Sequence, residues 1–168
     1  GTTSRGLGDV YKRQINNYIK KKPKKIIFAD GEDENMLKAA SAFKNSNLGI
    51  PVLVGKEDLI KKQIKKIGYN ENFDLEIVNS KDSEKRERYV KYLFKKLQRQ
   101  KGMLERDCDR LVRNDRVIWG SCMVACGDAD AMVTGNSRRY GQSLDKVKKV
   151  IDARPGEIMF GLNMIVNK

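Results

Sequence analysis

The sequence predicts an α/β fold built as three αβα layers around a largely parallel sheet. Short apolar runs alternate with longer segments of helical periodicity through most of the 168 residues. This alternation is typical of strands joined by helical crossovers. The runs are apolar without interruption, as expected of parallel strands that helices cover on both faces. We predict strands at residues 26–29, 51–55, 75–78, 131–134 and 158–166.

An acidic turn, residues 30–33, follows the first strand and reads Asp-Gly-Glu-Asp. We interpret it as the amino-terminal cap of a helix, because carboxylates there accept backbone hydrogen bonds and complement the helix dipole. A paired-carboxylate site is the alternative. The helix is expected to bury the side chains spaced at i, i+3, i+4 and i+7, which are Met36, Ala39, Ala40 and Phe43.

Further helical patterns follow the second and third strands. The first of them ends at Gly68, a residue typical of helix carboxyl caps, and its inward residues are Leu59, Ile60, Ile64 and Ile67. The next, residues 81–100, is long and charged, with an apolar stripe of Tyr89, Val90, Leu93, Phe94 and Leu97. A short helix then carries the apolar residues Leu104, Cys108, Leu111 and Val112.

The candidate site lies in residues 115–140. An uncharged helix at 117–126 is too short to span a bilayer, so we expect it to be buried in the core. A short strand at 131–134, also expected to be buried, leads into a polar loop. Ligands bind at the carboxyl ends of strands in open α/β sheets. The candidate residues for binding an anionic ligand are Thr134, Gly135, Asn136, Ser137, Arg138, Arg139 and Tyr140.

In this loop the arginines, together with the backbone donors of residues 135–137, have the chemistry to hold phosphate groups. The alternative for Arg138 and Arg139 is a surface ion pair with Asp145 or Asp152. A last helix is predicted from Leu144, Val147, Val150 and Ile151, followed by a turn at 154–156. The strand predicted at 158–166 stops almost at the terminus, so we expect the fold to be incomplete at its carboxyl end.

The composition favours a protein without a nucleic-acid or membrane partner. The net charge is +13, but the basic residues are mostly lysines on the outer faces of predicted helices, without interleaved aromatic residues. No apolar run is long enough to cross a membrane, and no secretory signal is visible, so we expect a cytoplasmic protein. Cys108, Cys122 and Cys126 are interpreted as reduced core thiols rather than disulfides or metal ligands.

The amino-terminal residues differ from the rest of the chain. Residues 1–14 are rich in Gly and Thr and are interpreted as non-native adaptor sequence. Residues 15–25 form a basic lead-in, interpreted as a linker, in which Pro23 would break a helix. The folded part is expected to be residues 26–168.

Two segments resemble the phosphate acetyl/butyryl transferase family. They are IIFADGEDENMLKAA, at residues 26–40, and QRQKGMLERDCDRLVRNDRVIWGSCMVACGDADAMVTGN, at residues 98–136. The pairs Arg113-Asn114 and Arg139-Tyr140 look most like the version of this domain fused to the carboxyl side of bacterial NADP-dependent malic enzymes. The Pro-Lys-Lys at 23–25 resembles the linker before that domain.

The resemblance implies an isocitrate/isopropylmalate dehydrogenase-like fold, of which this chain carries the first half. It implies acetyl-CoA or CoA and phosphate as ligands, and a homo-oligomer. In malic enzymes it implies a regulatory domain that responds to acetyl-CoA, with NADP and a divalent metal bound only in a malic enzyme portion before residue 15. A true phosphate acetyltransferase is the alternative. The family's catalytic residues lie in the second half, so the resemblance assigns no catalytic residue here. Arg138 stands where relatives often have a small residue, which favours Arg139 and Tyr140 as ligand contacts.

Overall fold

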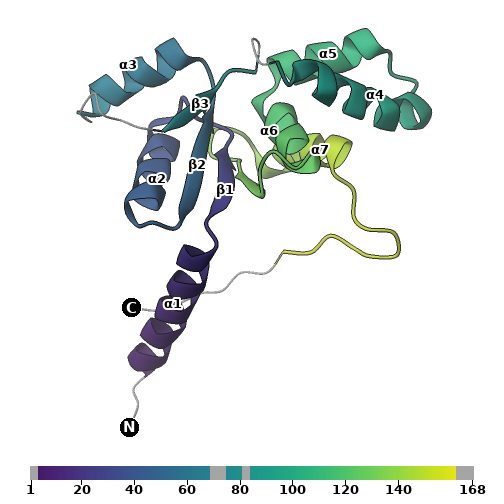
Figure 1. The fold of residues 1–168 in the computed structure, drawn as a ribbon. Coiled ribbons are helices and arrows are strands. Elements are labelled where there is room, and N and C mark those ends of the chain that lie inside the picture. The colour runs from purple at the N-terminus through teal and green to yellow at the C-terminus, as the bar shows by residue number, and fades with distance from the viewer. Residues whose placement is uncertain (1–3, 69–74, 81–83, 162–168) are drawn as a thin grey trace.

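The computed structural model describes residues 4–68, 75–80 and 84–161. Its strands form one parallel sheet in the order β3-β2-β1-β4, with helices on both faces (Figure 1). The strands are β1 (Lys24–Phe28), β2 (Gly49–Val54), β3 (Glu76–Val78) and β4 (Ala131–Val133). The predicted fold class is therefore confirmed, and four of the predicted strands form within two residues of the expected positions.

The helices after β1 follow the predicted order, and a helix that was not predicted, α1, precedes them. They are α1 (Ser4–Lys21), α2 (Glu34–Asn45), α3 (Glu57–Ile67), α4 (Arg86–Lys101), α5 (Glu105–Asn114), α6 (Arg116–Ala125) and α7 (Tyr140–Val150). Gly68 ends α3 in the left-handed conformation, as predicted. The start predicted for α4, at residues 81–83, lies outside the described residues.

Two apolar layers cover the two faces of the sheet. Helices α2 and α3 pack on one face, where the buried side chains are Phe28, Leu53, Met36, Leu37, Ala40, Ile60 and Ile64. Helices α4 to α7 pack on the other face, around the fully buried Trp119 of α6. The Trp119 ring meets the Tyr89 ring edge-on, with 4.9 Å between centroids. The predicted burial of α6 is confirmed.

Gly120 lets α6 lie close to the sheet. A Cβ atom on this residue would stand 2.6 Å from the Met132 Sδ of β4 and 3.2 Å from the Ile27 Cγ2 of β1. The first distance is shorter than Cβ atoms normally show and the second is tighter than most, so a side chain at residue 120 would require Met132 and Ile27 to shift. The amino terminus of α6 lies beside the carboxyl ends of the strands, where Asp115 meets Arg138 and Arg116 meets Glu32.

Two of the predicted inward faces are partly wrong. In α2, Ala39 is exposed and Leu37 is fully buried, because the helix turns the residue next to Met36 toward the sheet. In α3, Leu59 is 44% exposed, whereas Ile60 and Ile64 enter the core. Leu59 stands at the edge of the apolar face, so periodicity alone could not distinguish it from a core residue.

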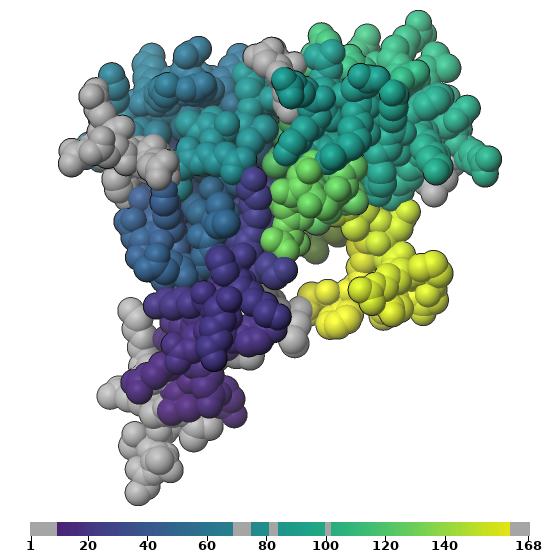
Figure 2. Space-filling view, in the orientation of Figure 1, coloured from purple at the N-terminus to yellow at the C-terminus, as the bar shows by residue number. Residues whose placement is uncertain are grey.

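The strand β4 is not buried, contrary to prediction. It lies at one edge of the described sheet, pairing only with β1, and Val133 is 44% exposed. The predicted strand at 158–166 is also wrong in its described part, since residues 158–161 form no strand and have no regular secondary structure. Ile158 and Phe160 are more than 80% exposed, and Figure 2 shows this carboxyl-terminal segment, in yellow, standing away from the body. Residues 162–166 lie outside the described part.

Helix α1 crosses the boundary predicted between residues 14 and 15. It projects from the start of β1, on the side of the sheet away from the strands' carboxyl ends (Figure 1). Part of residues 1–14, interpreted above as non-native sequence, thus belongs to the same helix as the start of the predicted linker. The helix ends at Lys21, before Pro23, as the proline requires. Within the described ranges, no helix has the length and apolar character needed to span a membrane.

Candidate functional site

The candidate loop lies beside the acidic turn that follows β1. Strands β1 and β4 are parallel neighbours, so their carboxyl ends meet, and the Ala29 N–H donates to the Val133 carbonyl at 3.0 Å. The chain then turns at Gly135, which has a φ of +105°, a backbone conformation that glycine adopts more readily than other residues. This pairing brings residues 135–137 against Asp30 and Asp33, more than a hundred positions earlier in the sequence.

Both aspartates of the turn hold the loop. The carboxylate of Asp30, only 4% exposed, accepts from the Ser137 hydroxyl at 2.7 Å and from the Gly135 N–H at 3.3 Å. Asp33 accepts from the Asn136 side-chain amide at 2.6 Å while also capping α2 through Asn35 and Met36. The predicted capping role is confirmed for Asp33. The turn therefore also fixes the loop, which the sequence interpretation missed.

A third carboxylate, Asp115, holds the far end of the loop. Its Oδ1 accepts from the backbone N–H groups of Val117 and Ile118, which caps α6. Its Oδ2 accepts from Arg138 at 3.1 Å and also bonds the Lys146 ammonium. Burial would raise the pKa of Asp115, but the hydrogen bonds from Lys146 and Arg138 outweigh it and hold this pKa below its ordinary value of 3.8.

Arg138 and Arg139 therefore differ in what they can do. Arg138 is 30% exposed and engaged with Asp115. Arg139 is exposed, occupies the position before α7 without a side-chain capping bond, and has no ion pair with any described residue. Tyr140, the first residue of α7, is 78% exposed. The geometry leaves Arg139 and Tyr140 as the side chains of this loop most open to a ligand.

The alternative for these arginines was an ion pair with Asp145 or Asp152, and Arg138 does form an ion pair, but with a different aspartate. Arg138 pairs with Asp115, and Asp152 instead pairs with Lys96 at 2.7 Å. Asp115 was not predicted because its contact with Arg138 depends on how α6 and the loop pack. The only signal in the sequence was an aspartate just before an apolar helix, which is typical of an N-cap.

Two of the donors predicted for ligand binding are already used inside the protein. The Gly135 N–H and the Ser137 hydroxyl both donate to Asp30. The Thr134 hydroxyl is buried and has no hydrogen-bond partner among the described residues. Internal hydrogen bonds therefore hold the loop in place, and the side chains of Arg139 and Tyr140 remain exposed for contact with a ligand.

The cysteines lie away from this loop, in the core. Cys108 and Cys122 are buried, and Cys126 is half-buried. Burial raises the pKa of the Cys122 thiol to about 12. In the described ranges, no cluster of three or more histidine, cysteine or carboxylate side chains is arranged to hold a metal ion.

Curated relatives fall into two groups. The chain is 39% identical over 146 residues to a probable NADP-dependent malic enzyme of Rickettsia prowazekii, covering 86% of this chain and 19% of the relative. It is 37% identical over 153 residues to an NADP-dependent malic enzyme of Rhizobium meliloti, covering 90% and 20%. It is 31% identical over 147 residues to a phosphate acetyltransferase of Helicobacter pylori, covering 87% and 28%. The chain thus spans a fifth to just over a quarter of these relatives.

Solved structures agree on the fold. A phosphotransacetylase from Streptococcus pyogenes matches with a TM-score of 0.79 at 23% identity, covering 90% of this chain and 45% of the other. The EutD phosphotransacetylase from Staphylococcus aureus matches with a TM-score of 0.75 at 24% identity, covering 88% and 44%. The family profile described as phosphate acetyl/butaryl transferase matches residues 10–168. The chain therefore belongs to the phosphate acetyl/butaryl transferase family.

Proposed function

We propose that this chain is part of the acyl-CoA-binding, phosphotransacetylase-like domain of an NADP-dependent malic enzyme, where it regulates rather than catalyses. The two malic enzymes described above share more identity with the chain than the phosphate acetyltransferase does. Two residue pairs resemble the malic enzyme version of the domain. Arg113-Asn114 lies at the end of α5, and Arg139-Tyr140 lies at the start of α7.

The observation that carries the proposal is the exposure of Arg139 and Tyr140 on a loop held by three aspartates. An exposed guanidinium can bind a phosphate of CoA through two hydrogen bonds at once. An exposed aromatic ring offers a face on which the adenine base can stack. Asp30, Asp33 and Asp115 hold the backbone in place, so little entropy is lost when the ligand is bound.

The parent protein proposed here oxidises and decarboxylates malate to pyruvate in the cytoplasm. NADP and a divalent metal would bind in a malic enzyme portion preceding residue 15, and acetyl-CoA bound to this domain would alter the rate of that reaction. Assembly of a homo-oligomer through the complete domain would couple the two portions.

A true phosphate acetyltransferase is the second candidate. It is favoured by the family match and by the similarity to the Helicobacter pylori enzyme. In that case the domain would move an acetyl group between CoA and phosphate, which requires groups that stabilise the charge developing at the transferred carbonyl. No residue of this chain is assigned to that role.

Isothermal titration of the chain with acetyl-CoA and with CoA tests the shared part of both candidates. Saturable binding to a single site is expected, and no measurable heat at high ligand concentration would contradict both. An assay of the complete parent protein then separates them. A malate-dependent reduction of NADP that changes with acetyl-CoA supports the malic enzyme. Formation of acetyl phosphate from acetyl-CoA and phosphate at enzymic rates would show a catalytic domain instead.

A further inference from the structure

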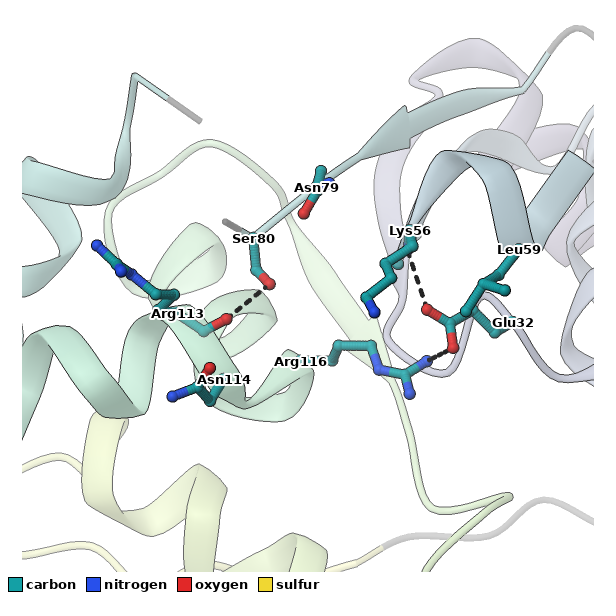
Figure 3. A pocket seen from close by; sticks show the side chains of 9 residues that line it. Glu32, Lys56, Leu59, Asn79, Ser80, Arg113, Asn114 and Arg116 are labelled. Carbon is teal, nitrogen blue, oxygen red and sulfur yellow. Dashed lines mark hydrogen bonds and ion pairs between the residues drawn. The ribbon is translucent and has the colours of Figure 1, made fainter. Parts of the chain in front are cut away.

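A polar pocket lies outside the loop at residues 134–140. This pocket has a volume of about 270 Å³ and opens at the carboxyl ends of β1, β2 and β3 (Figure 3). Its walls come from the turn after β1, the start of α3, the end of β3 and the junction of α5 with α6. None of residues 134–140 lines it. The residues used below are Glu32, Lys56, Ser80, Arg113, Asn114 and Arg116.

Two cationic side chains converge on this pocket. Figure 3 shows the Lys56 side chain, from the residue before α3, reaching toward the side chain of Arg116 in α6, whose guanidinium points to Glu32. Glu32 is the carboxylate on the same wall, and both of its oxygens are engaged. Its Oε1 accepts from the Lys56 backbone N–H at 3.0 Å, and its Oε2 pairs with Arg116 at 3.3 Å. Glu32 therefore neutralises Arg116 and leaves the charge of the Lys56 ammonium uncompensated.

Lys56 has no ion pair with any residue of the described ranges. Since Glu32 compensates Arg116, an anion in the pocket would chiefly compensate the ammonium charge of Lys56. Arg113 adds a further positive charge at the rim, where its guanidinium is 44% exposed and 3.6 Å from Asp109. The cations lining the pocket thus outnumber its single carboxylate, Glu32.

The opposite wall is polar and fixed in place. The Ser80 hydroxyl, on a residue only 8% exposed, donates to the Arg113 carbonyl at 3.1 Å and ties the end of β3 to the end of α5. Asn114 adds a side-chain amide to this wall. A volume of about 270 Å³ corresponds to roughly nine water molecules in the liquid, which exceeds what one phosphate group needs.

We propose that this pocket binds the phosphate group of a small phosphomonoester, at a site separate from the acyl-CoA loop. Lys56 and Arg116 hold the phosphate oxygens, and the remaining volume receives the ester's organic part. The carboxyl ends of parallel strands are the usual place for such ligands in α/β folds. Because the second ionisation of a phosphomonoester has a pKa of about 6, binding strengthens as the pH rises from 5 to 7.5.

The test is a calorimetric titration of the whole chain with glycerol 3-phosphate and with inorganic phosphate at constant ionic strength. We expect the phosphomonoester to bind more tightly than inorganic phosphate. Lys56→Gln should weaken it by about tenfold, whereas Lys62→Gln, which removes an exposed charge from α3, the helix that follows Lys56, should not. Equal effects of the two variants would mean nonspecific attraction to a basic surface and would overturn the proposal. Tighter binding of inorganic phosphate would overturn the assignment of an ester.

Titration with acetyl-CoA decides whether the site is separate. Lys56→Gln should leave the affinity for acetyl-CoA unchanged within about twofold, as expected for independent sites. A parallel loss of both affinities would show that the pocket belongs to the acyl-CoA site. If Lys56→Gln does not fold, amide chemical shifts of the unsubstituted chain replace it. Glycerol 3-phosphate should then shift the amides of Lys56 and Arg116 and leave that of Gly135 in place, and the reverse pattern would contradict the proposal.

Discussion

The buried carboxylate of Asp30 accepts a hydrogen bond from the hydroxyl of Ser137 at 2.7 Å, across 107 positions of sequence. This contact joins the turn after β1 to the loop after β4 and sets where that loop lies. Strands β1 and β4 are parallel neighbours, so the two segments meet at one edge of the sheet.

Replacing Asp30 should loosen the loop more than it damages the fold elsewhere. Asp30→Asn keeps the size but removes the charge and turns one carboxylate oxygen into an amide donor, so the Gly135 N–H and the Ser137 hydroxyl can no longer each donate to an oxygen of their own. We expect a loss of about 1–3 kcal/mol in the free energy of unfolding, measured by urea denaturation. Hydrogen exchange at residues 135–137 should also quicken. Asp58→Asn, on the exposed first turn of α3, is the control and should change neither.

The ion pairs of Asp115 predict how stability depends on pH. Its pKa is lowered in the folded protein, so its contribution is present above the ordinary value of 3.8 and is lost as the pH falls through the folded pKa. Asp115→Asn retains a good N-cap residue but not the charge. The variant should be less stable by about 1–3 kcal/mol at pH 7, and the difference should shrink toward zero once the pH falls below the lowered folded pKa of Asp115. A difference that is the same at both pH values would show that the charge does not matter.

The close contact at Gly120 predicts an overpacking effect. Gly120→Ala places a Cβ against Met132 and Ile27 and should cost about 1–3 kcal/mol in thermal or urea unfolding. Gly141→Ala is the matched control, because an added Cβ in α7 meets nothing within 4 Å, and it should be neutral or slightly stabilising. The double variant Gly120→Ala/Met132→Val should recover part of the loss, since a shorter side chain makes room. Equal stability of the two single variants would refute the packing account.

The cysteines should differ in their reactivity with thiol reagents. The Cys122 pKa of about 12 leaves almost no thiolate at pH 8, and both Cys122 and Cys108 are buried. Burial also raises the pKa of Cys126, but this residue is half-buried. A chromogenic thiol reagent should therefore modify Cys126 first in the native protein and all three cysteines after denaturation. Rapid native modification of Cys122 would contradict the structure.

The fold could be predicted because its signals are local. Apolar runs alternating with helical periods fixed the order of elements, and Gly68 and Asp33 marked helix ends that the structure confirms. The burial of β4 could not be predicted, because its few apolar residues look the same in a central and an edge strand. Likewise, residues 158–161 carry a strand-like pattern, yet strand formation needs a partner edge, and none pairs with them in the described part of the chain.

The candidate site was predicted only as a segment. The loop at 134–140 was identified from its place after a strand, but the roles within it depend on contacts between distant residues. Asp115 lies 23 positions before Arg138, and Asp30 lies 107 before Ser137. No local pattern shows that Arg138 is engaged while Arg139 stays open. The pocket of Lys56 and Arg116 was missed for the same reason, since its walls come from four separate segments.

The central claim is that Arg139 binds the acyl-CoA ligand, and calorimetric titration of acetyl-CoA into two arginine variants tests it most directly. Arg139→Gln removes an exposed guanidinium that makes no capping bond, and Arg154→Gln removes another exposed guanidinium from the carboxyl-terminal segment. The account predicts that Arg139→Gln weakens acetyl-CoA binding by about tenfold or more, whereas Arg154→Gln leaves it unchanged. Equal affinities of both variants and the unsubstituted chain would contradict it.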